Sequence, residues 1–114
     1  MSRVRYTPDR GDIVWLNFAP QTGHEQSGKR PALILSPSSY NQKVGLALCC
    51  PITSRIKEYP FEVALPSESK IQGAILSDHV KSLDWKARRA TFIERVEDEV
   101  HSSVAKKIQL LLKG

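Results

Sequence analysis

The amino-acid sequence predicts a mainly β protein, a small barrel of short strands with one helix at its C-terminal end. Residues 12–96 contain several short apolar runs that are rich in β-branched and aromatic residues, and polar loops with Gly or Pro separate them. Only the segment 97–113 repeats its apolar residues at the spacing of a helix. With 114 residues the chain can bury one modest core, so residues 1–114 are expected to form one domain.

The first expected strand, residues 12–18, favours a closed barrel over a half-exposed sheet. Alternation places Ile13 and Trp15 on one face and Val14 and Leu16 on the other, so both faces are apolar. Trp15 is accordingly expected in the core. Further strands are expected at residues 32–35, 46–52, 61–65, 73–80 and 90–96, with one helical turn at residues 40–42.

The segment 97–113 is expected to be an amphipathic helix that covers the barrel. Val100, Val104, Ile108 and Leu111 follow each other at spacings of four, four and three, which places them on one face. Acidic residues gather at its beginning and lysines at its end, and both groups complement the helix dipole. His101 is expected on the polar face, in contact with solvent.

Composition narrows the classes of partner. The net charge of +5 favours acidic partners, nucleic acid first. No apolar run approaches the ~20 residues of a membrane helix, and the N-terminus lacks the apolar region of a signal peptide. A cytoplasmic protein without membrane contact is therefore expected. The two cysteines are adjacent and no Cys/His spacing suits zinc, so neither a metal nor another cofactor is expected.

Residues 23–31, Gly-His-Glu-Gln-Ser-Gly-Lys-Arg-Pro, carry more functional groups than a simple turn requires. They connect the first two expected strands. In an antiparallel barrel alternate loops share one end, so this loop is expected to face residues 53–59 across the mouth of the barrel. The side chains expected to meet there are His24, Glu25, Arg30, Thr53, Ser54 and Lys57, with Asp78 and His79 from the end of the 73–80 strand.

This set of groups suits the cleavage of an RNA phosphodiester without a metal. A base takes the proton of the ribose 2′-hydroxyl, a cation stabilises the phosphorane, and an acid protonates the leaving 5′-oxygen. The guanidinium of Arg30 can hold two phosphoryl oxygens, and the hydroxyl of Thr53 can donate to the same oxygens. The same residue types also occur in solvated loops, so residue types alone leave both interpretations open.

Longer motifs resolve this choice. Residues 23–31 read Gly-x-Glu-Gln-x-Gly-x-Arg-Pro and residues 51–54 read Pro-x-Thr-Ser, where x is any residue. Segments 10–14, 59–63 and 77–84 add further matches. With these motifs the sequence resembles the MazF/PemK (Kid) family of toxins from type II toxin–antitoxin systems, and in particular its MazF branch. The resemblance extends from about residue 9 to the C-terminal helix.

The resemblance implies a fold, an activity and partners. The fold is an SH3-like, MazF/CcdB-like barrel with a terminal helix, in a homodimer that binds RNA across its interface. The activity is sequence-specific, metal-independent cleavage of single-stranded RNA, mostly mRNA, which leaves 2′,3′-cyclic phosphate and 5′-hydroxyl ends. Such a toxin inhibits translation and growth until a cognate antitoxin neutralises it. The antitoxin's disordered acidic tail occupies the RNA groove, and DNA is contacted only through the antitoxin.

Carried over residue by residue, the resemblance implies that Arg30 and Thr53 are catalytic and that Glu25 is a catalytic or supporting carboxylate. His24 and Asp78 match positions of the PemK branch that take part in RNA binding or catalysis. The remaining residues expected to bind RNA or to support the site are Gln26, Ser54, Lys57, His79, Lys81, Arg88 and Asp12.

Two departures from the PemK branch limit the assignment. Leu76 stands where that branch has an essential arginine, so catalysis must rest on Arg30 and Thr53. His79 stands where glutamine is usual, and it is open whether it reads a base, carries a proton or only packs. Asp12 is equally open between a loop anchor and a secondary site residue.

Two alternative functions use the same fold. A CcdB-type toxin binds DNA gyrase and cleaves nothing, and it has no need of Arg30 together with Thr53. A module that binds RNA or antitoxin without cleaving RNA is the other alternative. Trp85 and Tyr59 lie beside loops, where stacking on RNA and packing in the protein are both open.

Overall fold

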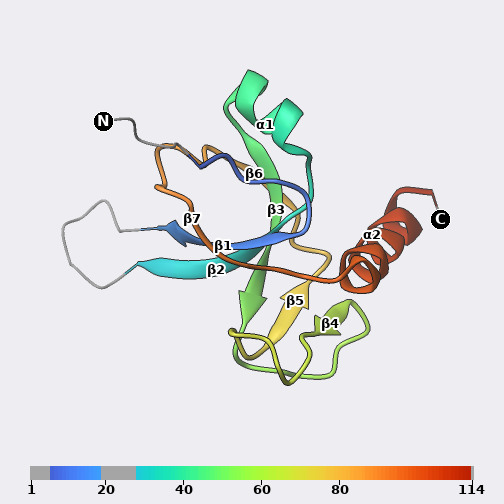
Figure 1. Ribbon diagram of the computed structural model, residues 1–114. Helices are drawn as coiled ribbons and strands as arrows, with labels where there is room; N and C mark the ends of the chain where they lie inside the picture. The colour runs from blue at the N-terminus through green and yellow to red at the C-terminus, as the bar shows by residue number, and fades with distance from the viewer. Residues whose placement is uncertain (1–5, 19–27, 114) are drawn as a thin grey trace.

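The computed structural model describes residues 6–18 and 28–113. Its strands pair antiparallel in the order β4–β5–β3–β2–β1–β7, with β6 on β3 (Figure 1). The elements in chain order are β1 (Asp12–Asn17), β2 (Lys29–Ile34), α1 (Ser38–Val44), β3 (Ala47–Thr53), β4 (Glu62–Ala64), β5 (Ala74–Leu76), β6 (Lys81–Leu83), β7 (Thr91–Arg95) and α2 (Asp98–Lys113). The expected mainly β fold with a C-terminal helix is confirmed.

Apolar side chains pack on both faces of the curved sheet, as the alternation in the first strand indicated. Ile13 and Leu33 belong to one buried cluster, which also contains Val104 of α2. Val14 and Leu16 belong to a second cluster on the other face of the same strand. Each face of β1 therefore contributes to a core, and burying it stabilises the fold by about 25 cal/mol per Å² of apolar surface.

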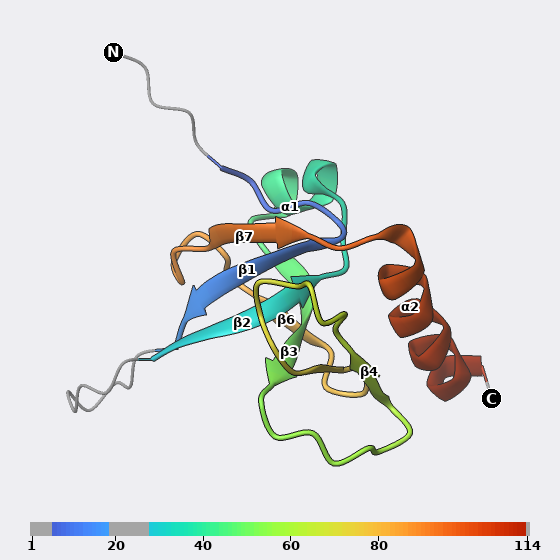
Figure 2. The same ribbon diagram turned by 60° about the horizontal axis from the view of Figure 1, so that its bottom comes forward.

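The helix α2 lies beside the sheet and packs on the first cluster (Figure 2). Val104 is fully buried, and Val100 and Ile108 are partly buried beside it. Two expectations for this helix were wrong. Leu111 is 54% exposed, because it lies beyond Ile108, the last residue of the helix that packs against the cluster. His101 is half-buried, and burial lowers the pKa of its imidazole.

The expected strand 73–80 is interrupted. Ile52 of β3 pairs with Ile75, but Cys49 of β3 pairs with Lys81. The two paired positions lie three residues apart on β3, whereas their partners on β5 and β6 lie six residues apart. The additional residues form a turn between β5 and β6. The turn closes with a hydrogen bond from His79 N to Leu76 O at 3.1 Å. It lifts Asp78 and His79 out of the sheet.

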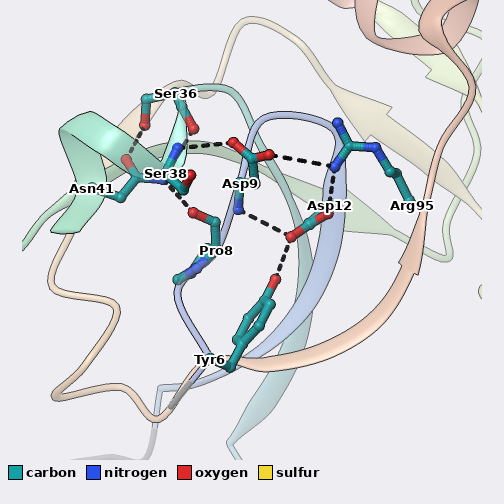
Figure 3. Close-up of polar contacts among 8 residues, drawn as sticks. All are labelled: Tyr6, Pro8, Asp9, Asp12, Ser36, Ser38, Asn41 and Arg95. Atoms are coloured by element: carbon teal, nitrogen blue, oxygen red, sulfur yellow. Dashed lines mark hydrogen bonds and ion pairs between the residues drawn. The ribbon is translucent and has the colours of Figure 1, made fainter. Parts of the chain in front are cut away.

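Residues 6–12 are tied to the sheet by a polar cluster around Asp12, which is 4% exposed (Figure 3). Its carboxylate accepts hydrogen bonds from Tyr6 Oη at 2.5 Å, Asp9 N at 3.0 Å and Arg95 Nη1 at 3.0 Å. Asp9 in turn accepts a bond from Ser38 N at the start of α1. Burial and the bond to Asp12 raise the pKa of Tyr6 above its ordinary value. The cluster therefore joins β1, α1 and β7.

Substitution Asp12→Ala is expected to lower the free energy of unfolding by about 2–3 kcal/mol, because it leaves buried donors without an acceptor. The loss stays at this size because the side chain of Arg95 is 54% exposed and regains hydrogen bonds to water. Urea unfolding measures the change. Asp12→Asn keeps the volume and one acceptor oxygen, so it should cost less. An Asp12→Ala protein as stable as the wild type would contradict this role.

Candidate active site

Arg30 and Thr53 come together through the pairing of β2 with β3. β2 begins at Lys29, so Arg30 lies in a strand and not in the preceding loop. The ladder between β2 and β3 ends at the pair of Ala32 and Pro51, and Arg30 and Thr53 lie two residues beyond that pair on their strands. There Arg30 pairs with Leu16 of β1 and Thr53 pairs with Ala74 of β5. The two residues reach one pocket from adjacent strands, and not from two loops that face each other across a barrel mouth.

Both residues line one open pocket of about 660 Å³. Two smaller pockets adjoin it. One, of about 220 Å³, shares Arg30 and contains Lys81, and the other, of about 290 Å³, shares Thr53 and contains His79. Arg30 and Thr53 each line two of these pockets, and the three pockets together are called the groove from here on.

The lining of the groove is strongly cationic. Among the described residues that line it, the single carboxylate is that of Glu62, which accepts hydrogen bonds from Lys57 N and Glu58 N. The cations that line it are Lys29, Arg30, Arg55, Lys57, Lys70 and Lys81. Such a surface attracts a polyanion, and low-dielectric walls strengthen the attraction.

Thr53 is held in place by the local backbone. Its Oγ1 accepts a hydrogen bond from Arg55 N at 3.0 Å, so its own proton is available for an acceptor in the pocket. Gly73, at a φ of +139°, lies directly against the same residue. A Cβ at position 73 would lie 2.2 Å from the carbonyl oxygen of Thr53. The approach of the two strands at this point therefore requires glycine.

The turn between β5 and β6 brings His79 to the Thr53 side of the groove. His79 lines the same pocket as Thr53 and Tyr59, and half of its side chain is exposed. Its Nε2 lies 3.8 Å from Asp78 Oδ1, while Asp78 Oδ2 accepts a hydrogen bond from Tyr59 Oη at 2.6 Å. That hydrogen bond raises the pKa of Tyr59, which keeps its phenol protonated. Asp78 thus contacts both His79 and Tyr59 and helps to hold these two groove residues in place.

Three other predicted site residues take different positions. Ser54 lines the central pocket beside Thr53. The guanidinium of Arg88 lies 4.7 Å from the ring centroid of Phe18, which lines the pocket that contains Lys81. Asp12 lies at the other end of β1, about 13 Å from the residue opposite Arg30 at ~3.3 Å per residue. The structure therefore assigns Asp12 to the polar cluster, and it does not join Arg30 and Thr53. His24, Glu25 and Gln26 lie outside the described residues.

The structure adds groove residues that the sequence did not single out. Trp15, expected in the core, is half-buried and lines the central pocket. Lys70 and Gln72 reach the same pocket from the loop between β4 and β5. Trp85 is 6% exposed and donates a hydrogen bond from Nε1 to Asn41 O, so it packs in the protein and does not offer a stacking surface.

Neither cysteine offers a reactive thiol. Burial raises the pKa of Cys49 to about 11 and that of Cys50 to about 12, so both stay protonated at neutral pH. Within residues 6–18 and 28–113, no three His, Cys, Asp or Glu side chains gather as a set of metal ligands. Over the same residues, no helix is both long and apolar enough to cross a membrane.

Sequence comparison relates this chain to known toxins. The sequence model of a family described as "PemK-like, MazF-like toxin of type II toxin-antitoxin system" matches residues 9–112. The endoribonuclease toxin MazF of Escherichia coli (strain K12) is 46% identical over 108 residues, which cover 95% of this chain and 96% of that protein.

Solved structures agree with the sequence comparison. A MazE-MazF crystal structure from Deinococcus radiodurans (Form-II) matches with a TM-score of 0.91 and 52% identity, over 95% of this chain and 97% of that chain. A crystal structure of MazF from the same organism (Form-I) matches with a TM-score of 0.86 and 51% identity, over 96% and 100% of the two chains. The expected MazF-like fold is confirmed.

Proposed function

Because this chain belongs to the family of PemK-like, MazF-like toxins of type II toxin–antitoxin systems, we propose that it is a sequence-specific endoribonuclease for single-stranded RNA. The observation that carries the proposal is that Arg30 and Thr53, on the adjacent strands β2 and β3, line one pocket together with several cations. A relative that is 46% identical is named an endoribonuclease toxin, in line with this activity. The gyrase-binding alternative has no use for this pair, and no observation favours it.

The proposed reaction needs no metal ion. A base removes the proton of the ribose 2′-hydroxyl, and the 2′-oxygen attacks the phosphorus while the bond to the 5′-oxygen breaks. Arg30 and Thr53 donate hydrogen bonds to the phosphoryl oxygens, where negative charge develops. An acid then protonates the 5′-oxygen, so the products are a 2′,3′-cyclic phosphate and a 5′-hydroxyl. Glu25 and His79 are the two candidates for proton transfer.

The other groove residues are proposed to bind the RNA strand. Lys57 lines the pocket that shares Thr53, Lys81 lines the pocket that shares Arg30, and both are proposed to bind phosphates beside the cleaved one. Ser54, Arg88, His24 and Gln26 are proposed as further contacts to RNA. Asp78 is proposed as a support for His79.

The double substitution Lys57→Ala/Lys81→Ala is expected to reduce the salt dependence of RNA binding. Each phosphate contact to a single strand contributes about 0.7 to the slope of log K against log salt, so the slope should fall by about 1.4. Filter binding measures the slope, in a Thr53→Val background in which cleavage is slow. Lys106→Ala/Lys107→Ala on α2 removes the same charge outside the groove and serves as the control. An unchanged slope in the groove variant would overturn the assignment.

We further propose the partners that accompany such a toxin. The Deinococcus radiodurans structure pairs MazF with MazE, and a MazE-like antitoxin is the partner we expect here. Its acidic tail would occupy the groove, since RNA and an acidic peptide compete for the same cations. The toxin is proposed to act as a homodimer in the cytoplasm, without membrane contact, and to meet DNA only through the antitoxin.

Incubation of the purified protein with a long single-stranded RNA in EDTA tests the function. Mapping of the new 5′ ends should show cuts at one short recurring sequence, and the ends should carry 5′-hydroxyls. A folded Thr53→Val protein should make the same cuts far more slowly, because it retains the shape of the side chain and lacks the hydroxyl. RNA that stays intact at high concentrations of wild-type protein would refute the proposal.

A further inference from the structure

The loop of residues 66–73 between β4 and β5 forms one wall of the central pocket. Lys70, Ile71 and Gln72 line this pocket together with Arg30 and Thr53. Lys70 and Gln72 are exposed, while Ile71 is partly buried against the first apolar cluster. The loop therefore offers Lys70 and Gln72 to the space where a substrate would lie. Ile71, between them, packs the loop against the apolar cluster.

A carboxylate outside the pocket holds this loop. Glu94 lies in β7, where it pairs with Ile13 of β1, and its side chain is partly buried. Its Oε2 accepts a hydrogen bond from Ser69 Oγ, and its Oε1 accepts one from Lys70 N at 3.1 Å. Ser69 Oγ also accepts a bond from Ile71 N at 3.3 Å. One side chain of the sheet thus fixes the three residues that come directly before Gln72.

The far end of the loop is also fixed. Leu65 N donates to Gly73 O at 3.0 Å, and Gly73 lies against the carbonyl of Thr53. Between these fixed points Gln72 keeps freedom at its amide, because its bond from Nε2 to Ser69 O spans 3.5 Å and is weak. The backbone on both sides of Gln72 is thus held by hydrogen bonds, while the side-chain amide of Gln72 can still adjust to a ligand.

The chemistry of this wall suits a nucleobase. A Gln amide offers two donors and an acceptor, and unpaired bases in RNA are read by hydrogen bonds to their edges. The half-buried aromatic residue Trp15 lines the same pocket. Such surfaces stack on bases without regard to their identity. The pocket thus combines a phosphate site at Arg30 and Thr53 with a stacking group and a discriminating amide.

We infer that Gln72 reads the base next to the cleaved phosphate and that Glu94 is a positioning residue, which sets the cleavage motif by fixing residues 69–71. This inference rests on the proposed ribonuclease function. Lys70 contacts a neighbouring phosphate from the same wall. Glu94 itself never touches the RNA.

The test is a comparison of cleavage sites on one RNA library for wild type, Gln72→Ala and Glu94→Ala. At one position beside the cut, the ratio of kcat/KM for the preferred base over the others should fall about tenfold in both variants. Glu94→Gln keeps an acceptor oxygen and should retain part of the ratio. Glu68→Gln removes a charge from the same loop, away from the Glu94 contacts, and should leave the motif unchanged.

The outcomes separate the two claims. If the wild type cuts at a motif that Gln72→Ala and Glu94→Ala both keep, the inference is wrong and the proposed function stands. A loss of rate that is equal at every site also refutes it, because a merely structural role would act in that way. Gln72 is exposed, so its variant should fold even if Glu94→Ala does not. A wild type that cleaves no RNA would overturn both claims.

Discussion

Substitution Arg30→Ala should lower the rate of RNA cleavage by about 10²–10³-fold while leaving the fold intact. The guanidinium is the central cation of the groove, and a preorganised donor to a developing oxyanion is worth this much in rate. The side chain contributes little to stability, since Arg30 is exposed at the start of β2. Single-turnover cleavage of a short RNA with one site measures the effect.

Two variants separate the geometry of Arg30 from its charge. Arg30→Lys keeps the charge but loses the planar fork that can hold two phosphoryl oxygens, so it should recover only part of the rate. Arg55→Ala removes another cation of the same pocket, and it should cost less than about tenfold. Equal losses in Arg30→Ala and Arg55→Ala would show that only the total charge matters.

Substitution Gly73→Ala should both destabilise the protein and impair cleavage. The added Cβ would lie 2.2 Å from Thr53 O, which is backbone and cannot turn aside. Overpacking of this kind together with the positive φ should cost about 2–4 kcal/mol in the free energy of unfolding. A shift of Thr53 by about 1 Å can cost about 10²-fold in rate. Urea unfolding and single-turnover cleavage measure the two effects.

Gly45 provides the matched control. It also has a positive φ, +85°, at the end of α1, but no atom lies within 4 Å of the position that a Cβ would take. Gly45→Ala should therefore show the conformational cost of about 1 kcal/mol alone and keep its cleavage rate. If Gly73→Ala proves no more harmful than Gly45→Ala, the close approach of Gly73 to Thr53 has no functional role.

Much of the fold follows from local patterns in the sequence. The alternation in β1 indicated two apolar faces, and both faces do contribute to a core. The spacing of Val100, Val104 and Ile108 indicated the buried face of α2. It could not show that Leu111 lies beyond the packed part of the helix, since periodicity reports a face and not the extent of the partner surface.

The interruption between β5 and β6 was not predictable in the same way. Residues 77–80 contain neither Gly nor Pro, and their polar side chains were interpreted as the end of the preceding strand. The shift in register against β3 is a property of two strands together. Because of this shift, His79 lies in a turn that lines the groove and not at the end of a strand.

The candidate site was anticipated by its residue types and only partly by its geometry. The motifs pointed to Arg30 and Thr53, and the structure places both in the lining of one pocket, an arrangement that a sequence alone does not show. The wall with Gln72 was missed because its anchor, Glu94, lies more than twenty residues away in the chain. Asp12 was a candidate by position, yet its three hydrogen bonds give it a structural role.

The central claim is that Arg30 and Thr53 act on one phosphate as a unit, and a double-mutant cycle tests it most directly. Single-turnover cleavage rates are compared for Arg30→Ala, Thr53→Val and the protein with both substitutions. Residues that act as a unit are strongly non-additive, so the double variant should be little slower than the slower single variant. Losses that multiply in the double variant would mean that the two residues act independently, and they would contradict this account.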